Sequence, residues 1–116
     1  MATGPIGSRG EEAAAEVYRR RGYRVVARNW RCRLGELDLV VERGGLLVFC
    51  EVKSRRQSAF GSGFEAVTRR KRAKLRAVAQ AFLQATGSNP QAIRFDVASV
   101  AVRGPRSTIE IFEEAF

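Results

Sequence analysis

The sequence predicts an α/β domain with a mixed β-sheet flanked by helices, in the order αβββαββ. Three observations lead to this fold class. Two amphipathic segments are each followed by a glycine that would end a helix. Segments with the pattern of β-strands lie between and after them. Gly44-Gly45 predicts a tight hairpin turn between two of these strands. Helices and hairpins mixed along one chain are typical of α/β architecture. The length of 116 residues predicts a single domain over residues 1–116.

Each element is supported by its own local signals. The first helix is expected over Ser8–Arg21, with Ser8 as its N-cap and Gly22 as its stop. A long second helix is expected over residues 62–86, because Gly87 follows it. Runs of β-branched and apolar residues predict the strands. They are expected over residues 23–30, 36–41, 46–55, 93–102 and 108–112.

The positive charge of the chain is concentrated in part of it. The chain has 21 Lys and Arg against 12 Asp and Glu, a net charge of +9, and residues 1–93 hold 18 of the basic but 8 of the acidic residues. Dense positive charge attracts polyanions, so nucleic acid is the expected partner, although a solvated, arginine-rich surface is the alternative. Two stretches carry most of this charge: Arg19, Arg20, Arg21, Arg24, Arg28, Arg31 and Arg33, and Arg69, Arg70, Lys71, Arg72, Lys74 and Arg76.

The composition also excludes several classes of site. The chain has no histidine, which excludes His-based triads and most zinc sites. Cys32 is expected to be a loop thiol and Cys50 a small core residue, because no base accompanies either. The longest apolar run, residues 46–50, is too short to span a membrane, and the N-terminus has no apolar export segment. A soluble, cytoplasmic protein without a membrane partner is therefore expected.

Three polar residues are expected to share one face of the sheet. Side chains alternate along a strand, so Glu51 and Lys53 point the same way. With a two-residue hairpin loop Asp38 lies opposite Glu51, and with a four-residue loop it lies opposite Phe49. Either register leaves Asp38, Glu51 and Lys53 on one face, whereas a loop of odd length would separate them.

This arrangement points to metal-assisted chemistry on phosphate. Facing carboxylates repel unless a cation lies between them, and hard oxygen ligands suit Mg²⁺ or Mn²⁺. A lysine beside such a metal would serve phosphodiester hydrolysis. The alternative is a cross-strand salt bridge. Only 3 of the 21 basic residues are Lys, so Lys53 favours a site that requires a compact ammonium.

Helical phase adds a third acid. At about 100° per residue, Glu11 lies at the edge of the inward stripe of the first helix and Glu12 points away. Glu11 is therefore expected either to reach the metal or to stabilise the helix dipole. The small residues of this stripe would let the helix approach the sheet closely. The stripe consists of Gly7, Gly10, Ala14, Val17 and Tyr18.

Other charged residues leave alternatives open. Lys71 falls on the apolar stripe of the second helix, so it either snorkels past its neighbours or reaches an anion at the site, such as a substrate phosphate. Glu36 is either a supporting residue of the site or part of a strand-edge salt bridge. Arg94 and Asp96 are expected to form a structural pair, with a catalytic role for Asp96 as the alternative. The stripe around Lys71 consists of Phe64, Val67, Leu75, Val78 and Phe82.

Together these residues resemble the YraN-type family of small bacterial proteins. The resemblance rests on Gly7-x-x-Gly10-Glu11 with Ala14, Gly22-Tyr23, Arg28-Asn29, Gly35-Glu36-x-Asp38, Glu51-Val52-Lys53, Phe60-Gly61, Lys71 and Arg94-Phe95-Asp96. It implies a restriction-endonuclease-like core of the PD-(D/E)-x-K superfamily, similar to archaeal Holliday-junction resolvases. Leu37 stands where the motif's name has Pro.

The resemblance also implies roles for individual residues. Asp38 and Glu51 would bind Mg²⁺, Lys53 would assist the nucleophile, and Glu11 matches the helix-borne acid of the resolvase-like branch. The implied catalytic set is Asp38, Glu51, Lys53 and Glu11, and the implied metal-binding set is Asp38, Glu51, Glu11 and Val52.

The leading hypothesis is a Mg²⁺- or Mn²⁺-dependent endonuclease that acts on DNA with structure-selective, resolvase-like or weakly sequence-specific cutting. Cutting two strands symmetrically needs two active sites, which favours a homodimer. The alternatives are a non-catalytic nucleic-acid-binding protein and a structural or ribosome-associated basic protein. The residues expected to contact nucleic acid are Lys71, Arg69, Arg70, Arg72, Arg31, Arg33 and Arg55.

Overall fold

The computed structural model describes residues 5–56 and 68–116, with the side chains of residues 9–55 and 68–116. The helices and strands in these residues follow the expected order αβββαββ, which is confirmed. They are α1 (Pro5–Arg20), β1 (Arg24–Cys32), β2 (Gly35–Arg43), β3 (Leu46–Arg56), α2 (Arg69–Thr86), β4 (Ala92–Arg103) and β5 (Arg106–Phe112).

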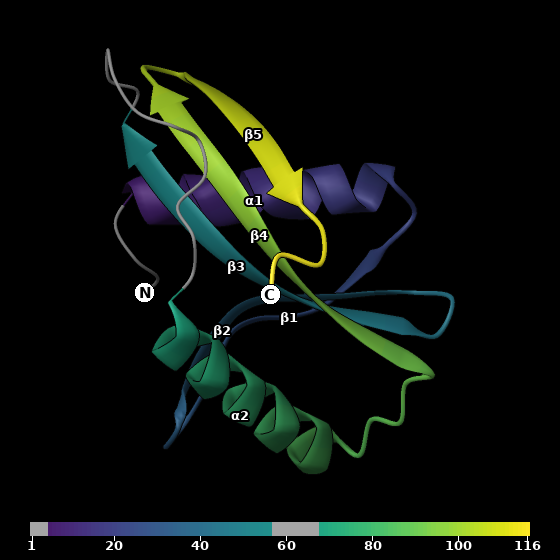
Figure 1. The fold of residues 1–116 in the computed structure, drawn as a ribbon. Helices are drawn as coiled ribbons and strands as arrows, with labels where there is room; N and C mark the ends of the chain where they lie inside the picture. The colour runs from purple at the N-terminus through teal and green to yellow at the C-terminus, as the bar shows by residue number, and fades with distance from the viewer. Residues whose placement is uncertain (1–4, 57–67) are drawn as a thin grey trace.

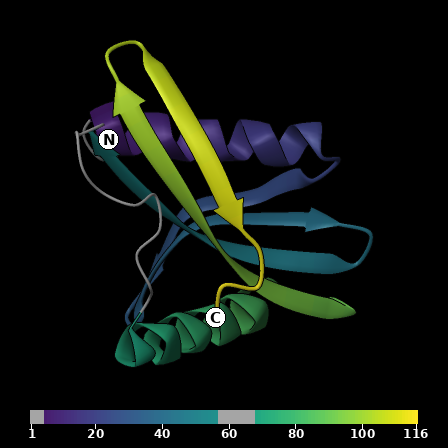
Figure 2. The same ribbon diagram turned by 45° about the horizontal axis from the view of Figure 1, so that its top comes forward.

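The strands form one mixed sheet in the spatial order β1-β2-β3-β4-β5. β3 and β4 are parallel, and the other neighbouring pairs are antiparallel. A parallel pair needs a crossover connection, and the chain between β3 and β4 contains α2. Figures 1 and 2 show α1 crossing one side of the sheet and α2 lying on the other. The expected α/β class is confirmed, and the arrangement fits a restriction-endonuclease-like fold.

Each face of the sheet has its own hydrophobic core. Successive residues of β3 serve different cores, because Phe49 belongs to the cluster around α2 and Cys50 to the cluster around α1. On the α2 side, the rings of Trp30 and Phe49 meet Phe82 edge to face. On the α1 side, Tyr18 is fully buried. These two cores fix both helices against the sheet and thereby position the residues between them.

The first helix begins earlier than expected. It starts at Pro5, so Ser8 lies inside α1 and the predicted N-cap is wrong. Proline is favourable in the first turn because a residue there has no intrahelical partner for its N–H. Of the expected inward stripe, Gly10, Ala14 and Tyr18 are buried and confirmed, whereas Val17 is half-buried. Gly7 lies outside the residues whose burial the structure describes.

The second helix begins later than expected. Thr68 has an extended backbone, with φ −63° and ψ 158°, and its hydroxyl accepts a hydrogen bond from the Lys71 N–H at 3.1 Å. Thr68 is therefore an N-cap, and the expected continuous helix from residue 62 is wrong. The stop at Gly87, which has φ 67°, is confirmed. Leu75, Val78 and Phe82 are buried as expected, whereas Phe64 and Val67 lie outside the described residues.

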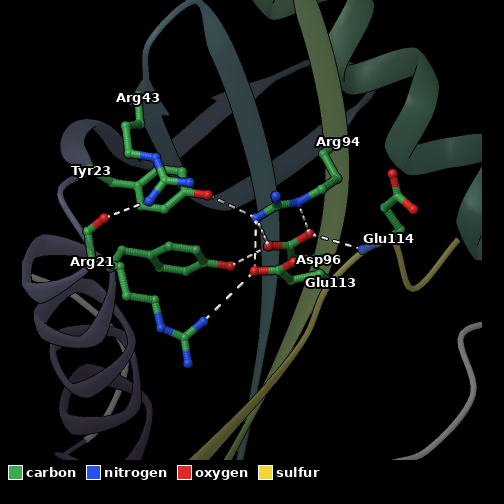
Figure 3. A network of polar contacts seen from close by, with 8 residues as sticks. Arg21, Tyr23, Arg43, Arg94, Asp96, Glu113 and Glu114 are labelled. Atoms are coloured by element: carbon green, nitrogen blue, oxygen red, sulfur yellow. Dashed lines mark hydrogen bonds and ion pairs between the residues drawn. The ribbon is translucent and has the colours of Figure 1, made fainter.

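A buried ionic network ties α1 to β4 and to the residues after β5 (Figure 3). Asp96 is fully buried, and both of its oxygens accept hydrogen bonds from Arg94, at 2.8 and 2.9 Å. Tyr18 donates to the same carboxylate at 2.7 Å, and the Glu114 N–H does so at 3.1 Å. Burial raises the pKa of Tyr18, which keeps its hydroxyl protonated as a donor. The expected structural pair of Arg94 and Asp96 is confirmed.

Neither described helix combines the length and the apolar character that crossing a membrane requires.

Candidate functional site

The turn between β2 and β3 sets the position of the candidate site. Gly44 and Gly45 both have positive φ, 55° and 84°, as a tight two-residue hairpin turn requires. Arg43 pairs with Leu46, so the two-residue loop is confirmed and the four-residue register is wrong. The ladder continues in this register as far as Leu39 opposite Cys50. It ends one pair before Asp38 would face Glu51.

Asp38 lies where β2 separates from β3. In place of the next ladder bond, the Val52 N–H donates to Asp38 Oδ2 at 2.9 Å. Leu37 packs in the core around α2 and Leu39 in the core around α1, although residues two apart on a regular strand share a face. β2 therefore changes its facing at Asp38. Its carboxyl group lies in the gap between the strands, within reach of groups from both faces.

The acids of the site influence one another. The pKa of Asp38 is raised to about 7, chiefly by burial and next by the charge of Glu51, and a hydrogen bond to Glu51 adds to the shift. The charge of Glu11 acts in the same direction, while the Val52 N–H opposes the shift. An aspartate whose ionised form is disfavoured by burial and by neighbouring acids is one that a bound cation would stabilise.

Glu11 enters the site because α1 approaches β3 closely. A Cβ atom at Gly10 would overlap the Ser54 hydroxyl and lie 3.0 Å from Ser54 Cβ, so glycine is required for this approach. The next residue, Glu11, is 5% exposed, whereas Glu12 is exposed and pairs with Arg28 at 2.8 Å. The expected inward orientation of Glu11 and outward orientation of Glu12 are confirmed.

Asn29 orients Glu11, a role that sequence reasoning missed. Its Nδ2 donates to Glu11 Oε1 at 3.0 Å, and Arg28 Nη2 lies 4.0 Å from the same oxygen. Asn29 has φ 52°, a left-handed conformation inside β1, between Arg28, which pairs with Leu39, and Trp30, which pairs with Leu37. Its Oδ1 is buried without a hydrogen-bond partner among the described residues. The available signal was an asparagine inside a strand pattern, because asparagine tolerates this backbone conformation better than most residues.

Lys71 reaches the site from α2. Its Nζ lies 2.9 Å from Glu51 Oε2, so the anion that holds this lysine is a carboxylate of the site itself. Glu51 is 12% exposed at its side chain and Lys71 43%. This contact places a positive group against the acids and reduces their mutual repulsion.

Lys53 lies on the same side of β3 as Glu51. Val52 packs against the α1 core, and Ser54 faces Gly10 of α1, so strand alternation directs Lys53 away from α1. Lys53 is half-buried and makes no ion pair with another described side chain. The cross-strand salt bridge considered for this lysine is therefore not observed in the described part of the chain.

The donor set fits a small hard cation. Within residues 9–55 and 68–116, no three acidic or cysteine side chains converge closely enough to form a complete metal site. Mg²⁺, however, is commonly held by one or two carboxylates and completes its shell with water and substrate phosphate. Asp38 and Glu51 supply two such oxygens, and Glu11 lies near them. Val52 has only backbone atoms to offer, and its N–H is already bonded to Asp38.

The basic residues expected to contact nucleic acid fall into three places. Arg69, Arg70 and Arg72 are exposed at the start of α2, next to Lys71. Arg31 and Arg33 are exposed at the end of β1 and in the turn after it, and Arg31 pairs with Glu36 at 3.5 Å. Arg55 is half-buried near the end of β3.

These contacts decide between the two roles left open for Glu36, and the structure also tests the expectations for the two cysteines. Glu36 forms a cross-strand ion pair with Arg31, its partner in the β1–β2 ladder, so it belongs to the strand edge. Cys32 is the last residue of β1, and the expected loop position is wrong. Cys50 is a buried core residue as expected, and burial raises the pKa of its thiol, which keeps it unreactive.

Comparison with known proteins identifies close relatives. The model of the uncharacterised protein family UPF0102 matches residues 10–100, which include Glu11, Asp38, Glu51 and Lys71. A UPF0102 protein of Symbiobacterium thermophilum is 48% identical over 95 residues, covering 82% of this chain and 80% of its own. One from Pelotomaculum thermopropionicum is 43% identical over 113 residues, covering 96% and 94%. One from Rhodococcus jostii is 41% identical over 112 residues, covering 96% and 95%.

Proposed function

The chain belongs to the uncharacterised protein family UPF0102, the YraN family that its motifs resemble, and from this premise we propose that it is a metal-dependent endonuclease acting on DNA. The observation that carries the proposal is the meeting of Asp38 and Glu51 where β2 separates from β3, with the pKa of Asp38 raised to about 7. A nucleic-acid-binding protein without catalysis would have no need for buried acids beside its basic surface.

Each residue of the site has a role in this proposal. Asp38 and Glu51 would hold Mg²⁺ or Mn²⁺, and Glu11, oriented by Asn29, would contribute from α1. The cation would supply polarisation of the scissile phosphate and a bound water of lowered pKa. Lys53, two residues beyond Glu51 on the same side of β3, would stabilise the negative charge that develops on the phosphate.

The substrate follows from the surface and the size of the fold. Exposed arginines at the start of α2 lie beside the site and would hold the phosphate backbone. Phosphate contacts carry no base information, so the proposed cutting is structure-selective or weakly sequence-specific. Symmetrical cutting of two strands would require two copies of the site, which we propose are brought together in a homodimer.

The test is a cleavage assay on branched, duplex and single-stranded DNA with Mg²⁺, with Mn²⁺ or with EDTA. We expect cutting by the wild type in metal only, with a loss of at least about 100-fold in Asp38→Asn and Lys53→Ala, because each removes a group that acts on the reacting phosphate. Glu36→Gln, a change to an acid of the same strand in a surface ion pair, should cut normally.

The alternative function has its own result in this assay. A wild type that binds DNA but never cuts it would support a non-catalytic nucleic-acid-binding protein. Cutting that survives Asp38→Asn would reject the proposed site and point to a contaminating nuclease.

A further inference from the structure

The ion pair between Lys71 and Glu51 couples the acids of the site to the basic end of α2. Lys71 is in the first turn of α2, and its backbone is held by the Thr68 cap, whose hydroxyl accepts the Lys71 N–H at 3.1 Å. The side chain extends from this fixed point to β3, where Nζ lies 2.9 Å from Glu51 Oε2. A lysine stem has rotatable bonds along its length, so its ammonium can move while its backbone stays in place.

The ammonium lies on an oxygen that the proposed metal site needs. Glu51 is 12% exposed at its side chain, so it has little access to water and depends on Lys71 as a counter-charge. A divalent cation on the same carboxylate would be repelled by an ammonium at hydrogen-bond distance. Lys71 and the cation are therefore competitors for Glu51.

A second position for the ammonium lies toward solvent. The Lys71 side chain is 43% exposed, so it is not enclosed by the protein. Its neighbours Arg70 and Arg72 are exposed on the same turn, and the first turn of α2 contains no acidic residue. These positively charged surroundings favour an anion. A phosphate group of a nucleic acid bound at the site would supply that anion.

We infer that Lys71 is an exchange residue, which holds Glu51 in the metal-free protein and transfers its ammonium to a nucleic-acid phosphate when Glu51 binds a divalent cation. The inference rests on the proposed metal-dependent function and deepens it. Because the same lysine opposes the cation alone and assists the substrate, cation and nucleic acid bind cooperatively. The site is thereby kept from binding metal tightly until DNA is present.

Metal binding without DNA tests the first half of the exchange. We expect Lys71→Met to bind Mn²⁺ about three- to tenfold more tightly than the wild type, because a half-exposed ion pair no longer has to be broken. Lys74→Met is the matched control, since it removes the same charge from an exposed position of α2, and it should stay within about twofold. Electron paramagnetic resonance of free Mn²⁺ measures the affinity of the full-length chain.

DNA binding tests the second half. Ca²⁺ should strengthen binding of a fluorescein-labelled DNA duplex to the wild type, and this gain should fall at least about threefold in Lys71→Met and not in Lys74→Met. Fluorescence anisotropy in Ca²⁺ and in EDTA measures the gain. Lys71→Gln repeats both measurements with a polar side chain, and circular dichroism confirms that each variant is folded.

The outcomes separate this inference from the proposed function. If the wild type binds Mn²⁺ and cuts DNA but Lys71→Met binds Mn²⁺ no more tightly than Lys74→Met, the exchange is wrong and the nuclease stands. If Asp38→Asn changes neither Mn²⁺ binding nor cutting, both are wrong. Tighter Mn²⁺ binding in both Lys71 variants, with loss of the Ca²⁺ gain, supports the exchange.

Discussion

Asp38 is a carboxyl group whose ionised form is disfavoured by its place in the fold. Burial and the neighbouring acids raise its pKa from 3.8 to about 7. A group whose pKa is raised by folding favours the folded state below its unfolded pKa and loses this contribution as pH rises through its folded pKa. Asp38 therefore makes the fold less stable as pH increases from about 4 to about 7.

An Asp38→Asn variant should remove this dependence. The amide keeps an oxygen that can accept the Val52 N–H, but it carries no charge. The unfolding free energy of the variant, relative to that of the wild type, should therefore grow between pH 4.5 and pH 8. One pKa unit corresponds to about 1.4 kcal/mol, so we expect a relative gain of at least about 1 kcal/mol. Urea unfolding in EDTA at both pH values measures it, with Glu36→Gln as the control. A constant difference across this range would contradict the pKa.

The acids of the site differ in how far the sequence could predict them. The inward turn of Glu11 follows from helical phase, and the shared face of Glu51 and Lys53 follows from strand alternation, because both are local geometric rules. The contact of Asn29 with Glu11 depends on an unusual backbone conformation, and the pair of Lys71 and Glu51 depends on where α2 docks. Neither follows from spacing along the chain.

At the scale of elements, one contact between α1 and β3 decides whether Glu11 reaches the site. Gly10 faces Ser54 so closely that any Cβ atom would collide with it. The Ser54 hydroxyl is buried without a hydrogen-bond partner among the described residues. The helix is therefore held near the sheet at the expense of an unsatisfied hydroxyl.

A Gly10→Ala variant should move α1 away from β3. Overpacking of this kind costs about 1–3 kcal/mol of unfolding free energy, and the shift should also withdraw Glu11. Adding Ser54→Gly removes both Ser54 atoms with which the new Cβ would collide, so the double variant should recover much of the loss. Thermal or urea unfolding of both single variants and the double variant measures the coupling. Additive effects of the two substitutions would show that this contact does not set the position of the helix.

The boundaries of helices and strands were predictable where a residue type is required by the backbone conformation, as glycine is at positive φ. Gly44-Gly45 gave the hairpin loop and thus the register of β2 on β3, because few other residues adopt two consecutive positive φ values. The helix starts were not predicted correctly. Ser8 is a suitable cap by type, yet α1 begins at Pro5, and α2 begins at Arg69 after the Thr68 cap. The end of the β2–β3 ladder at Leu39 was also not predicted, because there the Asp38 side chain accepts the Val52 N–H, and spacing along the chain does not show this contact.

At the scale of the molecule, the two basic stretches of the sequence are not equivalent. Most arginines of the first stretch form ion pairs with acids of α1, β2 and the residues after β5. Arg69 and Arg70 of the second stretch are exposed and make no ion pair with a side chain of the described residues. Arg69 and Arg70 therefore place positive charge without an acidic partner among the described residues at the start of α2, on the side of the sheet where Lys71 meets Glu51.

This asymmetry predicts which arginines bind DNA. The double variant Arg69→Gln with Arg70→Gln and the double variant Arg19→Gln with Arg20→Gln each remove two positive charges, so they change the net charge equally. Arg19 and Arg20 pair with Glu12 and Glu16, so their charge is already compensated. We expect the α2 variant to lose about tenfold in affinity and the α1 variant less than about threefold, because only the former removes phosphate contacts.

The salt dependence separates contact from general attraction. Each phosphate contact contributes about 0.9 to the slope of log affinity against log salt, so the α2 double variant should have a slope shallower by about one to two, while the α1 variant keeps the slope of the wild type. Fluorescence anisotropy of a labelled duplex in EDTA, over a series of salt concentrations, measures both quantities without cleavage. Equal losses in the two double variants would mean that DNA responds only to the total charge. A larger loss in the α1 variant would place DNA on the opposite side of the sheet, away from Asp38 and Glu51.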